Sequence, residues 1–340
     1  EVLAGKNSIN AVVVNSGNAN ACTGDQGYAD AAGMAELVEK ELKLGKFSVL
    51  VGSTGVIGHT LPMEKIRAKI PELVKNLSTE NSELFAKAIC TTDTMIKTGS
   101  VSVKTSAGEV RIGGSCKGSG MIHPNMATML AYITTDLRLP EDFSTEFRAL
   151  INESFNAITV DGDTSTNDTC LLLANAQSGI FLNDLGITEQ ADVRHALFDL
   201  MKHLALQIVR DGEGATKKVE IEVCGARNKA EAMQVAKSIA TSNLVKCAFF
   251  GEDPNWGRIV SSAGASGIPF PPAKLSLYFE EVQVVKDGMP IEAARERLAE
   301  IVKRKEYKIS LNLSSGDSKT SVFTSDLSYD YVKINAEYTT

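Results

Sequence analysis

The order of strand-like and helix-like segments is the feature that most constrains the fold of this chain. Short apolar stretches typical of strands are predicted at residues 9–14, 48–52, 131–136, 169–176 and 219–225. Helical periodicity of apolar residues is predicted at residues 28–44, 63–77, 82–89, 141–157, 188–209, 229–239 and 291–303. The two kinds of segment are mixed along the chain and do not alternate strictly.

Further strand signals occur in pairs. Residues 100–114 alternate like a hairpin that turns at Ala107 and Gly108. Strands are expected near residues 246–250 and 274–279, and a strand pair at 307–313 and 320–326. The chain shows no internal repeat, low-complexity tract or obvious linker. These features predict an α+β fold, a sandwich of β-sheets covered by helices, and argue against separate modules.

Charge and composition narrow the class of partner. With 340 residues, 43% of them hydrophobic, the chain can fill a substantial core. A net charge of -7, with basic residues scattered, argues against nucleic acid or an anionic membrane as the main partner and favours a small-molecule ligand. No apolar run approaches the roughly 20 residues of a membrane span, and the opening EVLAGKNSIN does not read as a signal peptide. We therefore expect a cytoplasmic protein.

Metal and nucleotide sites are not indicated. The six cysteines include no CxxC pair, so we interpret them as reduced thiols, and the four histidines are dispersed. The stretch DGDTSTND, which begins at Asp161, starts like a calcium loop, but its sixth position is Thr166 and its twelfth is Leu172. GEGATKK does not fit the phosphate-loop spacing, and NSGNANACTG does not fit the dinucleotide spacing.

Residues 116–130, CKGSGMIHPNMATML, place a turn-rich loop before an apolar segment that contains Thr128. A hydroxyl nucleophile needs a base. If the peptide bond between Ala127 and Thr128 is cleaved, the new α-amine of Thr128, with a pKa of about 7.7 to 8, can serve as that base. The alternative is a Pro-Asn turn that leads into a buried element, with Thr128 as an ordinary cap or core hydroxyl. The local pattern leaves both interpretations open.

Several blocks resemble one enzyme family. VVNSGNANACTG, STGVIG, TTDT, KGSGMIHPNMATML, VDGDTSTNDT, DGEGATK, DPNWGRI and NAEYTT occur in the order typical of the glutamate N-acetyltransferase family, also called ornithine acetyltransferases. These are self-cleaving enzymes of the cyclic arginine pathway. The blocks cover essentially the whole chain. Family members usually carry several dozen residues before the first block, including a first strand pair, and we expect such residues to belong to one sheet edge.

The resemblance implies a self-processing, N-terminal-nucleophile-like fold. It implies cleavage between Ala127 and Thr128 into an α chain, residues 1–127, and a β chain, residues 128–340. Thr128 would be the nucleophile, and Thr54 with the backbone of Gly55 would form the oxyanion hole. The implied substrate contacts, besides Thr128, are Thr91 (or its neighbours Thr92 and Thr94 in TTDT), Lys117, Glu213, Asn335 and Thr340.

The implied reaction moves an acetyl group from N-acetylornithine to glutamate through an acetyl-threonine ester, without a cofactor. Acetyl-CoA is a possible second donor, and two α and two β chains would assemble as a heterotetramer. Two alternatives stay open. One is a self-processing amidase or aminopeptidase that releases the acyl group to water, and the other is a noncatalytic ligand-binding protein.

Overall fold

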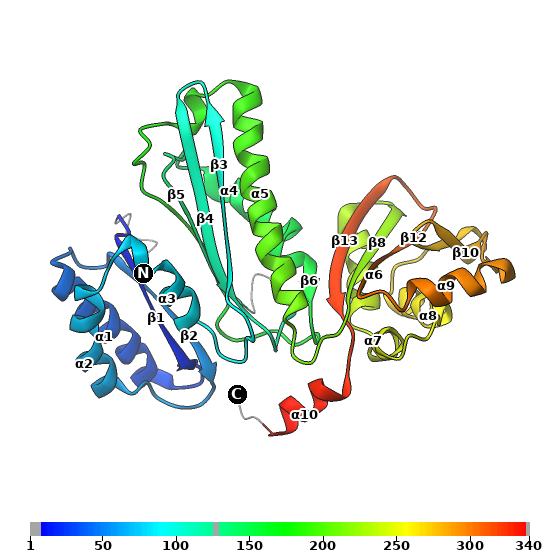
Figure 1. Ribbon diagram of the computed structural model, residues 1–340, viewed down its shortest axis with the longest axis horizontal. Helices are drawn as coiled ribbons and strands as arrows, with labels where there is room; N and C mark the ends of the chain where they lie inside the picture. The colour runs from blue at the N-terminus through cyan, green and yellow to red at the C-terminus, as the bar shows by residue number, and fades with distance from the viewer. Residues whose placement is uncertain (1–7, 125–128, 338–340) are drawn as a thin grey trace.

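The computed structural model describes residues 8–124 and 129–337, and the strands there form three sheets flanked by helices (Figure 1). The first sheet is the parallel pair β1 (Ala11–Asn18) and β2 (Val49–Val56). The second has the order β3-β4-β5-β7, and the third has the order β11-β10-β9-β12-β8-β13-β6. Mixed sheets with covering helices confirm the predicted α+β class.

Alternating side chains explain how the first sheet is buried on both faces. Val13 and Val49 face helices α1 (Gly24–Leu42) and α2 (Met63–Lys75). Val12 and Val14 point the other way and pack with Leu130 and Tyr132 of the second sheet. A Cβ at Gly52 would lie 2.3 Å from the Tyr132 hydroxyl. The glycine therefore permits the close approach of the two sheets.

The second sheet repeats this alternation. It contains β3 (Lys97–Thr105), β4 (Gly108–Lys117), β5 (Leu130–Thr135) and β7 (Thr169–Ala174). Ala131 and Ile133 face away from the first sheet, toward the core that helices α4 (Phe143–Glu153) and α5 (Ile187–Arg210) cover. The result is a helix-sheet-sheet-helix sandwich, with the short helix α3 (Ser82–Ala88) beside it (Figure 1).

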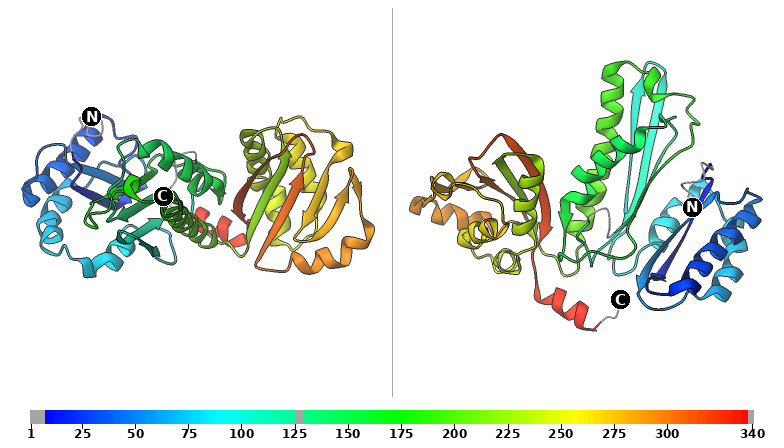
Figure 2. Two further views of the ribbon diagram at one scale, coloured as in Figure 1. Left: turned by 90° about the horizontal axis from the view of Figure 1, so that it is seen from above. Right: turned by 180° about the vertical axis from the view of Figure 1, so that it is seen from behind.

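The third sheet has its own apolar core and forms a separate lobe next to α5 (Figure 2), although the sequence features argued against separate modules. Its strands are β6 (Ile158–Thr159), β8 (Lys218–Ala226), β9 (Ser276–Phe279), β10 (Val282–Lys286), β11 (Met289–Pro290), β12 (Glu306–Asn312) and β13 (Ser318–Ser325). Its helices are α6 (Lys229–Ala240), α7 (Asn243–Phe250), α8 (Trp256–Ala265) and α9 (Arg295–Ile301). Helix α10 (Tyr329–Glu337) follows β13 and extends below the sandwich.

Most predicted elements are confirmed within a few residues, but three predictions were wrong. Residues 246–250 belong to helix α7, not to a strand. Strands β12 and β13 share a sheet but are not paired, because β8 lies between them. The hairpin turn falls at Ser106 and Ala107, since Thr105 pairs with Gly108. In the described part of the chain, no helix is both long and apolar enough to cross a membrane.

Candidate active site

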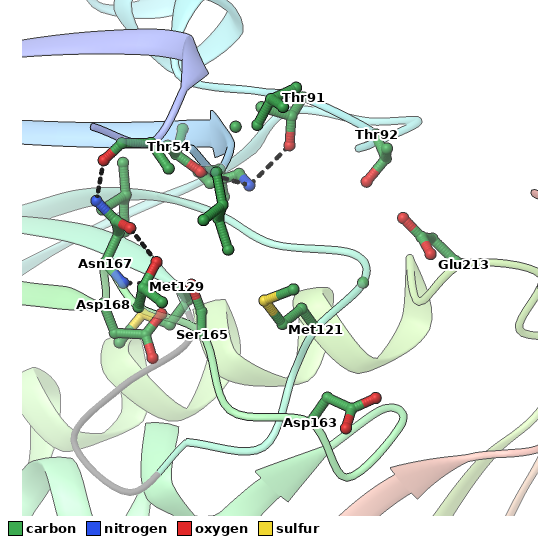
Figure 3. Close-up of a pocket in the computed structure, with 18 of the residues that line it drawn as sticks. Thr54, Thr91, Thr92, Met121, Met129, Asp163, Ser165, Asn167, Asp168 and Glu213 are labelled. Carbon is green, nitrogen blue, oxygen red and sulfur yellow. Dashed lines mark hydrogen bonds between the residues drawn. The ribbon is translucent and has the colours of Figure 1, made fainter. Parts of the chain in front are cut away.

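One pocket contains residues from both sheets of the sandwich, the loops between them and helix α10 (Figure 3). Six predicted site residues line it, although they are far apart in sequence. They are Thr54, Gly55, Thr91, Lys117, Glu213 and Asn335. Ala127, Thr128 and Thr340 lie outside the described residues, so their predicted roles stay predictions.

Lys117 joins two of the pocket threonines. Its Nζ donates hydrogen bonds to the hydroxyl oxygens of Thr91, at 2.8 Å, and Thr54, at 3.3 Å. Lys117 ends β4 and Thr54 lies on β2, so the contact bridges the two packed sheets. The lysine is only 8% exposed, and burial lowers the pKa of its ammonium, while the nearby Asp93 carboxylate opposes that shift. The structure thus places a buried cation between two hydroxyl groups.

The three threonines of TTDT differ in their contacts. Thr91 contacts Lys117, and Thr92 also lines the pocket. The Thr94 hydroxyl instead hydrogen-bonds to the carboxylate of Asp211. The geometry therefore favours Thr91 over Thr94 as the substrate contact.

The backbone conformation and surroundings at position 55 require glycine. Its φ is +130°, and a Cβ there would lie 2.2 Å from the carbonyl carbon of Gly17 on β1. An L side chain would meet both strain and a backbone clash. The parallel strands β1 and β2 thus approach closely where they enter the pocket, next to the Thr54 hydroxyl.

Glu213 and Asn335 form the opposite part of the pocket. The Asn335 amide Nδ2 donates to Glu213 Oε2 at 2.8 Å, which ties helix α10 to the loop after α5. Glu213 is buried, and its backbone N–H donates to the Ser119 carbonyl at 3.0 Å. A Cβ at Gly120 would lie 2.4 Å from the Glu213 carboxylate. The carboxylate therefore occupies space that only a glycine at position 120 leaves open.

The loop that contains residues 161–168 contributes side chains for which sequence reasoning assigned no role. The lining residues from this loop are Asp161, Asp163, Ser165, Thr166, Asn167 and Asp168. The two oxygens of Asp161 accept the backbone N–H groups of Met121 and Ile122 at 2.7 and 2.8 Å. The available sequence signal is the polar run between apolar segments, which starts like a calcium loop and belongs to a family block. Tyr331 of α10 was missed as well.

Within that loop, Asp168 has a buried carboxylate oxygen and a shifted pKa. Its Oδ2 is buried and has no hydrogen-bond partner among residues 8–124 and 129–337. Burial raises the pKa of this carboxyl to about 8, although the Lys117 ammonium opposes the shift. A carboxyl that titrates in this range can donate a proton in its neutral form and accept one in its ionised form. Figure 3 shows Asp168 beside Met129, the residue that follows Thr128 in sequence.

Comparisons with known proteins identify relatives of this chain. A model of the ArgJ family matches residues 1–340. The arginine biosynthesis bifunctional protein ArgJ of Geobacter sulfurreducens is 47% identical over 332 residues, which cover 97% of this chain and 84% of that protein. The protein of the same name from Thermotoga neapolitana is 45% identical over 347 residues, covering 99% and 86%.

A solved structure also matches. The crystal structure of the arginine biosynthesis bifunctional protein ArgJ of Bacillus halodurans is 40% identical and aligns with a TM-score of 0.58. The alignment covers 62% of this chain and 100% of that one.

Proposed function

Because the chain belongs to the ArgJ family, we propose that it is an acetyltransferase of arginine biosynthesis that moves an acetyl group from N-acetylornithine to glutamate. One observation carries the proposal. Thr54, Thr91 and Lys117, which come from three distant segments, are joined by hydrogen bonds in one pocket that also contains Glu213 and Asn335. The relatives named above are arginine biosynthesis proteins, which fits an amino-acid substrate.

The first step is self-processing. The Thr128 hydroxyl attacks the Ala127 carbonyl, and the resulting ester is hydrolysed to give the α chain, 1–127, and the β chain, 128–340. Residues on both sides of the proposed cleavage site support this step. Met129 lines the pocket, and the Lys237 ammonium donates to the carbonyl of Pro124 at 3.1 Å.

Acetyl transfer then takes two half-reactions. The Thr128 α-amine takes the hydroxyl proton as the oxygen attacks the acetyl carbon of N-acetylornithine. The C–N bond breaks, the ammonium returns the proton to the leaving nitrogen, and ornithine departs from an acetyl-threonine ester. The glutamate amine attacks this ester, its proton passes through the same α-amine to the threonine oxygen, and N-acetylglutamate leaves.

The pocket residues take complementary roles. The Thr54 hydroxyl accepts a hydrogen bond from Lys117, so its own proton is free to stabilise the oxyanion together with the Gly55 N–H. Lys117 and Thr91 bind the substrate carboxylate, because a buried ammonium attracts a carboxylate strongly. Glu213, held by Asn335, binds an amino group of ornithine. Thr340 completes the site at the end of the chain.

The use of cofactors, a second acetyl donor, the localisation and the assembly are inferred from the family. The exchange uses no cofactor, since the amide energy is retained in the ester. Acetyl-CoA is a candidate second donor, as the word bifunctional in the relatives' names suggests. We also propose a cytoplasmic heterotetramer of two α and two β chains, with neither nucleic acid nor membrane as a partner.

Substrate dependence tests the proposal. Purified protein is incubated with N-acetylornithine, with and without glutamate, and ornithine release is measured together with the mass of the peptide that starts at Thr128. We expect sustained ornithine release only with glutamate, and one added acetyl group on that peptide without it. Release at the same rate without glutamate indicates an amidase, and no release indicates a noncatalytic protein.

A further inference from the structure

A buried cluster of charges lies directly behind Lys117 and Thr91. Lys97, at the start of β3, is 0% exposed. Its Nζ lies 2.7 Å from Oδ1 of Asp93 and also contacts Oδ2 of Asp211. Buried ions are retained only where partners compensate their loss of hydration. These three side chains compensate one another, yet none of them lines the pocket.

Asp93 connects this cluster to the pocket. Its Oδ2 accepts the Thr91 backbone N–H at 3.1 Å and lies 4.0 Å from the Lys117 Nζ. Its Oδ1 accepts the Gly118 backbone N–H at 2.7 Å. One carboxylate therefore fixes the backbone at Thr91 and beside Lys117, the two residues that contact each other in the pocket.

Asp211 extends the cluster toward the other end of the pocket. Its carboxylate accepts the backbone N–H of Thr94 at 3.1 Å. Its backbone carbonyl accepts the hydroxyl of Ser119 at 2.6 Å. Asp211 lies two residues before Glu213, and Asp93 binds the backbone next to Lys117. The cluster therefore fixes the chain near both candidate substrate-binding groups, Lys117 and Glu213.

The surrounding charges affect whether the Lys117 side chain is protonated. Burial disfavours its ammonium form, and four charged or titratable groups act on it. The Asp93 carboxylate raises the Lys117 pKa and is the strongest of them, Lys97 lowers it, and Cys90 and Asp168 raise it. Lys97 contacts Oδ1 of Asp93 at 2.7 Å, whereas Lys117 lies 4.0 Å from Oδ2, so Lys117 has no tight ion pair with Asp93.

We propose that Asp93 is the positioning residue of this pocket: it aligns Thr91 with Lys117 and keeps Lys117 charged for the carboxylate of an amino-acid substrate. Lys97 is its counterpart, because its ammonium pairs with the other oxygen of Asp93 and its positive charge opposes the charged form of Lys117. The inference rests on the proposed function, in which Lys117 binds the substrate carboxylate. Neither residue takes part in bond making.

The test is the pH dependence of KM for N-acetylornithine in D93N and K97Q, two substitutions that remove charge at nearly constant size. In D93N the amide oxygen can accept only one of the two backbone N–H groups, those of Thr91 and Gly118, that the carboxylate accepts. Carboxylate binding is lost as pH rises through the Lys117 pKa, and beyond that pKa the charged fraction falls about tenfold for each pH unit. In D93N the Lys117 pKa falls, so the rise in KM begins at lower pH than in the wild type. In K97Q it begins at higher pH. Values of kcat change less than KM in both variants.

The matched control is D326N. Asp326 is also buried and accepts two backbone N–H groups, those of Thr216 and Lys217, at 2.8 and 2.9 Å, but it lies outside the pocket. If Asp93 has only a structural role, D93N lowers stability as D326N does, and the pH dependence of KM stays unchanged in both variants. If D93N does not fold, K97Q carries the test through its opposite shift. Wild-type pH profiles in the folded variants overturn the proposal.

K117M separates this inference from the proposed function. If K117M leaves KM unchanged, Lys117 does not bind the substrate and the proposed function fails at that residue. If K117M raises KM but D93N and K97Q keep the wild-type pH profile, only the role of Asp93 is wrong.

Discussion

The Nζ of Lys117 lies 2.8 Å from the hydroxyl oxygen of Thr91, a residue 26 positions away in sequence. The same nitrogen reaches Thr54 on the neighbouring sheet at 3.3 Å. An ammonium has three N–H donors, so these two contacts leave one for a ligand. One N–H donor of this ammonium is thus available for the substrate carboxylate that we propose to bind here.

Replacing this ammonium therefore affects binding first. We expect K117M to raise KM for N-acetylornithine about 10- to 100-fold, because a hydrogen bond to a charged group contributes about 1.5 to 3 kcal/mol. The fall in kcat is expected to be smaller. Steady-state kinetics at neutral pH measure both values. K104M is the control, since Lys104 is exposed on β3, and an equal effect in both variants contradicts the assigned role.

Gly120 offers a second test, directed at the Glu213 end of the pocket. A Cβ at position 120 would lie 2.4 Å from the Glu213 carboxylate. Because that carboxylate ends a flexible side chain, we expect G120A to fold with Glu213 displaced and its contact with Asn335 lost. KM for N-acetylornithine is then expected to rise about tenfold, the effect of losing about 1.4 kcal/mol.

The control for G120A is G264A. Gly264 lies in α8 with nothing within 4 Å of a Cβ, so alanine is expected to stabilise the helix by about 0.5–1 kcal/mol without changing KM. Thermal unfolding and kinetics of both variants make the comparison. Unchanged KM in G120A would show that the position of Glu213 does not matter for binding.

The raised pKa of the Asp168 carboxyl predicts that the stability of the protein depends on pH. Burial raises the pKa of its carboxyl from 3.8 to about 8 in the folded protein. Between these values the folded state binds more protons than the unfolded state, so wild-type stability falls as pH rises through this window. D168N removes the titrating group. We expect it to be more stable than the wild type at pH 8 by at least about 1.4 kcal/mol, the equivalent of one pKa unit, and to lose this advantage near pH 4.

Urea unfolding of D168N and the wild type at both pH values measures this difference. D163N is the comparison, because Asp163 lines the same pocket but is exposed, whereas burial is what raises the pKa of Asp168. A stability difference between D168N and the wild type that does not vary with pH contradicts the raised pKa.

Local pattern predicted most elements because each depends on nearby residues. Helix α5 and the β3–β4 hairpin have clear helical and alternating periods. The prediction of a strand at residues 246–250 was wrong because a short apolar run fits both a strand and a helix. The helix there begins after Ser242, whose hydroxyl accepts the Val245 N–H and was the available start signal. The position of β8 between β12 and β13 depends on long-range pairing, which no local pattern records.

The site was predictable only in part for the same reason. Family motifs identified Thr54, Thr91, Lys117, Glu213 and Asn335, which all line the pocket. The contact between Lys97 and Asp211 joins residues 114 positions apart. Asp211 opens the DGEGATK block, but no local pattern pairs it with Lys97. Asp168 was part of a recognised block, but its burial follows from the packing of the loop and not from its neighbours in sequence.

The most direct measurement of the central claim is the intact mass of the purified wild-type, T128A and T128S proteins, with ornithine release measured on the same samples. T128S keeps a hydroxyl and an α-amine at the new chain start, so it is the matched control. We predict two fragments, the second beginning at residue 128, and glutamate-dependent activity for the wild type and T128S. For T128A we predict one inactive chain of 36.4 kDa. Cleavage at this bond in T128A, or acetyl transfer by T128A at the wild-type rate, would contradict the account.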